Sequence, residues 1–399
     1  MKRSIIILTI TLLLISIGIW VYVFFSTPQT NSTETFSDLN LGDTTDTLGQ
    51  PFREPSEQPV VDVTGPEKLR QLTTRPVLGY RDIMVGTSSD RLVQFVEAGT
   101  GHIYLINLTT GAEERISNNT IVGVASAAIS LDGRYVAVKI GHGLNKNVQI
   151  ITVDRQADSN RAVVTEFPVA VTDFSITQAG ELLYTQSNTL GTAASLYDLE
   201  TKTTRSLFNI PFVDAAIRWS ADAAGPHLIY PKTASQLEGY LYEVMNGVFT
   251  RLPISGYGLS AVGNEQFVLY SKIENTNYIN RTLWRASDST VDGISYPYLP
   301  DKCSLSPHSS TTVVCAFSIG DTFSTTAAED WYSGIVSYQD SLWEVRPLEN
   351  AIIRLSDPLA DVGRGIDIQN IVVSQSGEQI YFTSKQDRSL WLYDKVASN

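Results

Sequence analysis

Two cysteines are the residues whose spacing most directly suggests chemistry. Cys303 and Cys315 lie equally far before and after Ser309, within a predicted turn between two strands. Residues that face each other on antiparallel strands are close enough to form a disulfide. The alternative is that both are small buried apolar side chains, as free cysteines often are. In either case we expect the pair to be structural.

A second group of candidates combines acidic and aromatic side chains. Glu329, Asp330, Trp331 and Tyr332 are consecutive, and Tyr278 lies in another predicted loop. Exposed aromatic residues on loops commonly anchor a partner protein, and the same chemistry suits a glycan. These five residues are therefore our candidates for ligand or partner binding. The alternative is that Trp331 and Tyr332 fold back and cover the edge of a sheet.

Sequence patterns typical of enzymes or metal sites do not occur. The histidines at 102, 142, 227 and 308 are far apart, with no His-x-x-x-His spacing and no cysteine beside them. The segment 256–260 lacks the final glycine of a nucleophile elbow. We expect no metal, no cofactor and no catalytic residue. A non-enzymatic role is favoured, and a hydrolase or lyase acting in a central funnel is the alternative.

The charge of the chain argues against nucleic acid as a partner. Lys and Arg total 29 against 42 Asp and Glu, which gives a formal net charge of −13. A surface this acidic repels phosphate backbones.

The N-terminal segment has the composition of a membrane anchor. Ile5 to Phe25 is almost entirely apolar, and at ~1.5 Å per residue a helix of this length spans roughly 30 Å. Lys2 and Arg3 precede it and the acidic Glu34 follows it, so we expect a cytoplasmic N-terminus and an extracytoplasmic remainder. The alternative is a cleaved signal peptide, which has a shorter apolar region.

The chain as a whole divides into three parts. We assign 1–25 to the short cytoplasmic N-terminus and the anchor. Residues 26–66 are rich in Thr, Ser, Pro, Gly and Asp, and this composition predicts a disordered tether. Residues 67–399 form the folded domain.

A repeat within the folded domain predicts its architecture. A motif of an aliphatic residue, usually an aromatic one, a polar one and an aliphatic one occurs seven times, beginning at residues 103, 148, 196, 241, 283, 342 and 390. A strand signal precedes each copy and a short outer strand follows most of them. Four short strands per unit of ~40–50 residues are typical of a propeller blade. We therefore predict an all-β, seven-bladed β-propeller rather than a β-sandwich.

Two irregularities of the repeat carry further predictions. The step from 283 to 342 is longer than the others, which places an insertion at about 320–340 in the sixth blade, around Glu329 to Tyr332. The last blade reaches the end of the chain without an outer strand, and 68–73 has the missing pattern. We expect this N-terminal strand to close the ring and cover the open sheet edge.

The chain resembles WD-repeat-like propellers of the TolB type. The turn Ser130-Leu131-Asp132-Gly133 before an aliphatic strand is similar to their blade signature. Segments 101–104 and 330–334 are similar to bacterial envelope proteins that join one N-terminal span to such a propeller. This resemblance implies protein–protein contacts in the envelope and no catalytic residues. On this basis we expect a membrane-tethered module that binds or scaffolds a protein or peptide of the cell envelope.

Overall fold

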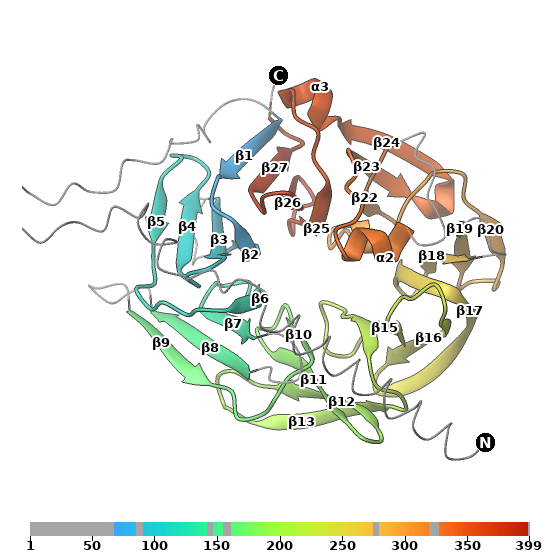
Figure 1. Cartoon of the computed structure of the whole chain (residues 1–399), viewed down its shortest axis with the longest axis horizontal. Coiled ribbons are helices and arrows are strands. Elements are labelled where there is room, and N and C mark those ends of the chain that lie inside the picture. The colour runs from blue at the N-terminus through green and yellow to red at the C-terminus, as the bar shows by residue number, and fades with distance from the viewer. Residues whose placement is uncertain are drawn as a thin grey trace, which may run out of the picture. The chain divides into compact units, whose positions relative to one another are not determined.

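The folded part of the chain is a ring of antiparallel β-sheets. The computed structural model describes residues 68–84, 91–141, 147–154, 161–273, 279–318 and 327–397, within one compact unit, Val60–Asn399. The sheets are arranged radially around a common centre (Figure 1). The predicted anchor and tether, 1–25 and 26–66, lie outside the described residues. In the part that is described, no helix is both long and apolar enough to span a membrane.

Five of the sheets have four strands each. In the first three the strands follow chain order: β2 (Val77–Ile83), β3 (Leu92–Glu97), β4 (Ile103–Asn107) and β5 (Glu113–Arg115); β6 (Val124–Ile129), β7 (Tyr135–Ile140), β8 (Asn147–Asp154) and β9 (Arg161–Glu166); β10 (Asp173–Ile176), β11 (Leu182–Asn188), β12 (Gly191–Tyr197) and β13 (Thr204–Ile210). The other two are β21 (Cys303–Leu305), β22 (Val313–Phe317), β23 (Ser341–Arg346) and β24 (Ala351–Ser356), and β25 (Ile368–Val373), β26 (Gln379–Ser384), β27 (Leu390–Asp394) and β1 (Leu69–Thr73).

The remaining sheet has seven strands and corrects the predicted count. Its strands are β14 (Ala215–Arg218), β15 (His227–Pro231), β16 (Glu238–Met245), β17 (Val248–Gly263), β18 (Phe267–Ile273), β19 (Ile279–Arg285) and β20 (Val291–Gly293). The first part of β17 pairs with β16 and its last part with β18, and Tyr257 has a partner on both. The structure thus has five separate four-stranded blades, and not the seven separate blades that the sequence predicted. The reason is that the register of β17 shifts around Pro253 and again between Tyr257 and Ser260 without ending the strand.

The seven copies of the sequence motif all form the third strand of a four-strand series. These strands are β4, β8, β12, β16, β19, β23 and β27. Their leading residues, such as Ile103, Leu241 and Leu390, are completely buried. They pack in apolar layers between neighbouring sheets, as where Val96 and Ile103 meet Val136. The motif therefore records the packing of one sheet against the next.

An N-terminal strand completes the last sheet, as the sequence predicts. β1 pairs antiparallel with β27, with Leu69 opposite Tyr393. Leu72 is buried in a cluster with Val77 of β2 and Leu390 of β27. Strand β1 thus joins the two ends of the folded domain and covers the edge of β27.

The inner strands approach one another so closely that some positions tolerate no side chain. Gly79 on β2 faces β6, and an added Cβ would lie 2.3 Å from the carbonyl oxygen of Ala127. Only glycine allows this approach of two backbones.

Antiparallel order also decides which loops share a face of the ring. Connections from the second to the third strand of a series, and from one series to the next, emerge on the same face. We call this the insert face and define it by the connections 189–190, 211–214, 232–237 and 327–340. The last of these contains α2 (Ala327–Tyr332). A second short helix, α3 (Pro358–Val362), lies between β24 and β25, and a 3₁₀ turn, η2 (Pro347–Glu349), lies between β23 and β24.

Cys303 and Cys315 face each other in the register of β21 and β22. Their sulfur atoms are joined in a disulfide, and both residues are buried among Phe267, Tyr298 and Trp343. The bridge therefore fixes the inner two strands of this sheet and is structural.

Replacing Leu72 by Ala should weaken the closure of the ring. The substitution empties part of the layer between β1, β2 and β27, and such a loss costs about 2–5 kcal/mol of the free energy of unfolding. Urea denaturation followed by circular dichroism measures it. Leu190, which is 90% exposed, is the matched control, and Leu190→Ala should cost less than about 0.5 kcal/mol. Equal small effects at the two positions would show that β1 does not contribute to closure.

The disulfide predicts a specific labelling pattern. The chain has two cysteines, and the structure leaves neither of them free. Protein unfolded without reductant should take up no maleimide, and reduced protein should take up one label per cysteine in a mass spectrum. Reduction should cost about 3 kcal/mol of stability, because the short loop between the cysteines regains its freedom in the unfolded chain. Labelling before reduction would contradict the bridge.

Candidate functional site

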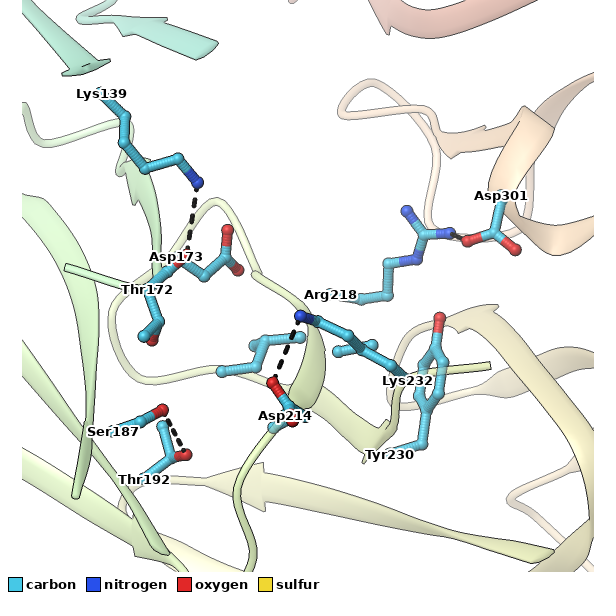
Figure 2. A pocket seen from close by; sticks show the side chains of 13 residues that line it. Lys139, Thr172, Asp173, Ser187, Thr192, Asp214, Arg218, Tyr230, Lys232 and Asp301 are labelled. Atoms are coloured by element: carbon cyan, nitrogen blue, oxygen red, sulfur yellow. Dashed lines mark hydrogen bonds and ion pairs between the residues drawn. The ribbon is translucent and has the colours of Figure 1, made fainter. Parts of the chain in front are cut away.

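A pocket of about 340 Å³ opens among the inner strands at the insert face (Figure 2). Its volume lies near the lower end of the range for small-ligand sites, roughly 300–1,000 Å³. The residues that line it lie between β7 and η1 (Pro300–Lys302), at the insert-face ends of strands, in the connections beside them and along the whole of β14. They are Lys139, Thr172, Asp173, Ser187, Thr192, Asp214, Ala215, Ala216, Ile217, Arg218, Tyr230, Lys232 and Asp301.

One side of the pocket is built around the ion pair of Arg218 and Asp301. Nη2 of Arg218 donates to Oδ1 of Asp301, and Nε of Arg218 donates to the carbonyl of Ala261 at 3.3 Å. The hydroxyl of Ser260 donates to Oδ2 of Asp301 at 2.5 Å. Burial raises the pKa of Tyr230, whose hydroxyl donates to the carbonyl of Ala261 at 3.5 Å. These contacts fix the guanidinium and the carboxylate relative to each other.

The other side of the pocket carries Asp173 and two lysines. One oxygen of the Asp173 carboxylate accepts the indole N–H of Trp219 at 3.0 Å. Burial raises the pKa of Asp173, and the positive charge of Lys139 partly offsets this effect. Nζ of Lys139 donates to the carbonyl of Thr172 at 3.3 Å. Lys232 lies 3.5 Å from Asp214, and because both are exposed this pair contributes little stability.

Charges of both signs therefore converge on the pocket and balance one another. Three cationic and three acidic side chains line it, and hydroxyl groups of Ser187 and Thr192 add hydrogen-bonding capacity. Such a site can bind a polar segment that supplies both donors and acceptors. No group of His, Cys, Asp and Glu able to hold a metal ion is found within the ranges that the structure describes.

Trp331 is buried, which corrects its expected role as an exposed anchor. It is 5% exposed, and its indole N–H donates to both carboxylate oxygens of Asp367, at 2.9 and 3.1 Å. Nζ of Lys385 lies 4.5 Å from the centre of its ring. The side chain thus folds back onto the last sheet, which was the alternative. The reason is that a buried carboxylate and a lysine lie beneath the insertion to receive it.

A buried ionic cluster lies under Trp331. Nζ of Lys302 is 2.5 Å from Oδ2 of Asp340 and 2.8 Å from Oδ1 of Asp367, and all three residues are buried. The backbone N–H groups of Ile368 and Tyr338 donate to the two carboxylates. Burial raises the pKa of Asp340 to about 6, the positive charge of Lys302 opposes this rise, and the negative charge of Asp367 adds to it. The cluster joins η1 to the connections that precede β23 and β25.

Glu329 and Tyr332 connect α2 to the neighbourhood of the pocket. The carboxylate of Glu329 accepts the N–H of Ser235 at 2.6 Å and its hydroxyl at 2.8 Å. Tyr332 is 50% exposed, but its hydroxyl lies beside Asp301. Burial of the hydroxyl and the charge of Asp301 raise the pKa of Tyr332. The structure thus places Tyr332 at the edge of the pocket and Glu329 in a structural contact.

Two further candidates have a different outcome. Asp330 lies in α2, and its carbonyl accepts the N–H groups of Ile335 and Val336. Tyr278 lies outside the described residues, and so does the first part of the predicted insertion, up to residue 326.

The charged residues of the pocket were not identified from the sequence. Asp173 and Arg218 lie in the first strand of their series, and Asp301 lies just before one. A charged residue inside or beside an inner strand is unusual, because the centre of a propeller is crowded. A charged residue in an innermost strand could therefore have indicated the pocket, but using this signal requires knowing which strand of each repeat is innermost.

Comparisons with known proteins found similarity among solved structures. No family model matches the chain, and no curated protein matches it in sequence. Among solved structures, TolB from Acinetobacter baumannii is similar over 79% of this chain and 66% of its own, with 13% identity and a TM-score of 0.39.

Two other solved structures are similar to this chain. The propeller domain of the Trilobed protease from Pyrococcus furiosus is 12% identical over 80% of this chain and 96% of that domain, with a TM-score of 0.49. A Bacteroides fragilis protein provisionally described as a 6-phosphogluconolactonase is 11% identical over 79% of this chain and 90% of its own, with a TM-score of 0.45. These similarities concern the fold alone.

Replacing Lys302 by Met should strongly destabilise the propeller. The substitution leaves Asp340 and Asp367 buried without their cation, and breaking a buried pair from one side costs about 3–5 kcal/mol. The matched control is Lys232→Met, which removes an exposed pair and should cost less than about 1 kcal/mol. Thermal and urea denaturation of both variants measure the difference. Equal stability of the two variants would contradict a structural role for the cluster.

Proposed function

We propose that this chain is a non-enzymatic propeller, tethered to the membrane, that binds a protein or peptide of the cell envelope at the pocket on its insert face. The observation that carries the proposal is the pocket itself, where side chains of both charges converge from several sheets. Arg218 and Asp301 are already paired with each other, which suits recognition of a polar segment more than attack on a substrate.

Exposed apolar residues beside the pocket support a protein partner. Leu190 is 90% exposed in the connection between Ser187 and Thr192, and both of these residues line the pocket. Val213 is 49% exposed and precedes the lining residue Asp214. Exposed apolar groups beside a pocket provide apolar surface that a protein partner can bury.

The proposed location outside the cytoplasm has two supports. The apolar segment Ile5 to Phe25 follows Lys2 and Arg3, as in a single-pass anchor with its N-terminus in the cytoplasm. The disulfide between Cys303 and Cys315 is of a kind that persists in oxidising compartments. A disordered tether over 26–66 would give the domain a mean reach of about 35 Å.

We also infer that the seven-stranded sheet acts as two blades, so that the ring has seven. Two of its strand segments have the position of inner strands. β14 contributes Arg218 to the pocket, and the last part of β17 contributes Ser260 and Ala261, which contact the same ion pair.

A hydrolase or lyase is the second candidate. The observation in its favour is the Asp173 carboxyl, whose raised pKa and place in the pocket are typical of a general acid. Catalysis would appear as conversion of a captured partner by the purified chain, and Asp173→Asn would abolish it.

In-cell crosslinking of the full chain tests the leading proposal. Replacing Leu190 and Val213 by Ser should remove the crosslinked partner, because both lie at the mouth of the pocket. Replacing Leu359 and Val396 by Ser changes an exposed leucine and an exposed valine outside the pocket lining and is the matched control, which should retain the partner. Identical partners in the wild type and both variants would contradict binding at the pocket.

A further inference from the structure

We propose that the pocket selects a lysine or arginine side chain of the partner, which it binds at the carboxylate of Asp173. The inference rests on the proposed function, since it identifies the chemistry of the segment that enters the same pocket. It predicts a partner segment that is basic, with apolar residues that meet Leu190 and Val213.

The cations of the pocket are already engaged with groups of the chain itself. Arg218 donates to Asp301 and to the carbonyl of Ala261. Lys232 lies beside Asp214, and Lys139 donates to the carbonyl of Thr172. An incoming anion would have to break one of these contacts before it could be bound.

Asp173 has acceptor capacity that faces the pocket. A carboxylate can accept about four hydrogen bonds. Its Oδ2 accepts the indole N–H of Trp219 and the carboxylate also accepts the backbone N–H of Phe174, which leaves acceptor sites on a side chain that lines the pocket (Figure 2). The hydroxyl groups of Ser187 and Thr192 line the same pocket and can accept further hydrogen bonds. An ammonium or guanidinium group would therefore find a charged acceptor with neutral acceptors near it.

The charge of the whole chain favours the same choice. The formal net charge is −13, and oppositely charged partners associate faster and avoid like-charge repulsion. A basic segment is thus attracted to the domain before it reaches the pocket, and an acidic one is repelled.

Binding of two labelled peptides to the full chain in detergent tests the inference. One is acetyl-Gly-Leu-Lys-Leu-Gly-amide and the other has Glu in place of Lys, and both are followed by fluorescence anisotropy. The lysine peptide should bind at least about tenfold more tightly, because a hydrogen bond to a charged group adds that much affinity. Asp173→Asn should remove this difference, whereas Asp292→Asn, at an exposed residue outside the pocket lining that is paired with Arg285, should keep it.

A second variant separates recognition from folding. Lys139 is the internal cation next to Asp173, so Lys139→Met should strengthen binding of the lysine peptide severalfold. Tighter or equal binding of the glutamate peptide, or no binding of the lysine peptide at millimolar concentration, would overturn the inference. If the glutamate peptide binds and its binding depends on Leu190, the proposed function is retained and only the inferred preference for a basic side chain is rejected. If neither peptide binding nor crosslinking depends on Leu190, the proposed function falls as well.

Discussion

The buried charge of Lys302 is the interaction on which the architecture of the site depends. An ammonium group without water must be neutralised by nearby carboxylates, and leaving it unpaired is costly. Asp340 and Asp367 provide that neutralisation from the connections before β23 and β25, and Trp331 covers the cluster. One cation thus holds η1, α2 and the starts of β23 and β25 in a single arrangement.

The same turn also positions the pocket. Asp301 and Lys302 are adjacent in η1, yet Lys302 enters the buried cluster while Asp301 lines the pocket and pairs with Arg218. Tyr332, the residue after Trp331, brings its hydroxyl to Asp301. The structural cluster and the recognition surface are therefore neighbours along the chain. The ring, closed by β1, holds them at a fixed position relative to Asp173 on the other side of the pocket.

The sequence predicted the features that depend on local patterns. The motif of the third strand occurs in every series because this strand packs between two neighbouring sheets in each of them. The closing strand β1 and the facing positions of Cys303 and Cys315 also follow from pattern and turn symmetry. The continuity of β17 did not follow, because whether a strand ends at Pro253 depends on its partners in both neighbouring series.

Neither the pocket nor the burial of Trp331 could be predicted from local sequence patterns, because both depend on contacts between distant parts of the chain. Lys139, Asp173, Arg218 and Asp301 are far apart in sequence and meet only because the ring brings inner strands together. The sequence around a tryptophan that follows two acidic residues does not show whether its side chain is exposed or buried. Trp331 is buried because its indole N–H donates to Asp367, which lies far away in sequence, just before β25.

Hydrogen exchange in the full chain tests most directly whether the Lys302 cluster holds the insertion in place. The amides of Ser333, Gly334 and Ile335 donate within the turn that follows α2, so their exchange reports whether α2 stays folded onto the cluster. The account predicts much faster exchange of these amides in Lys302→Met than in wild type. It also predicts no change in Lys232→Met, and protected amides in β26 in all three proteins. Unchanged exchange at 333–335 in Lys302→Met would contradict it.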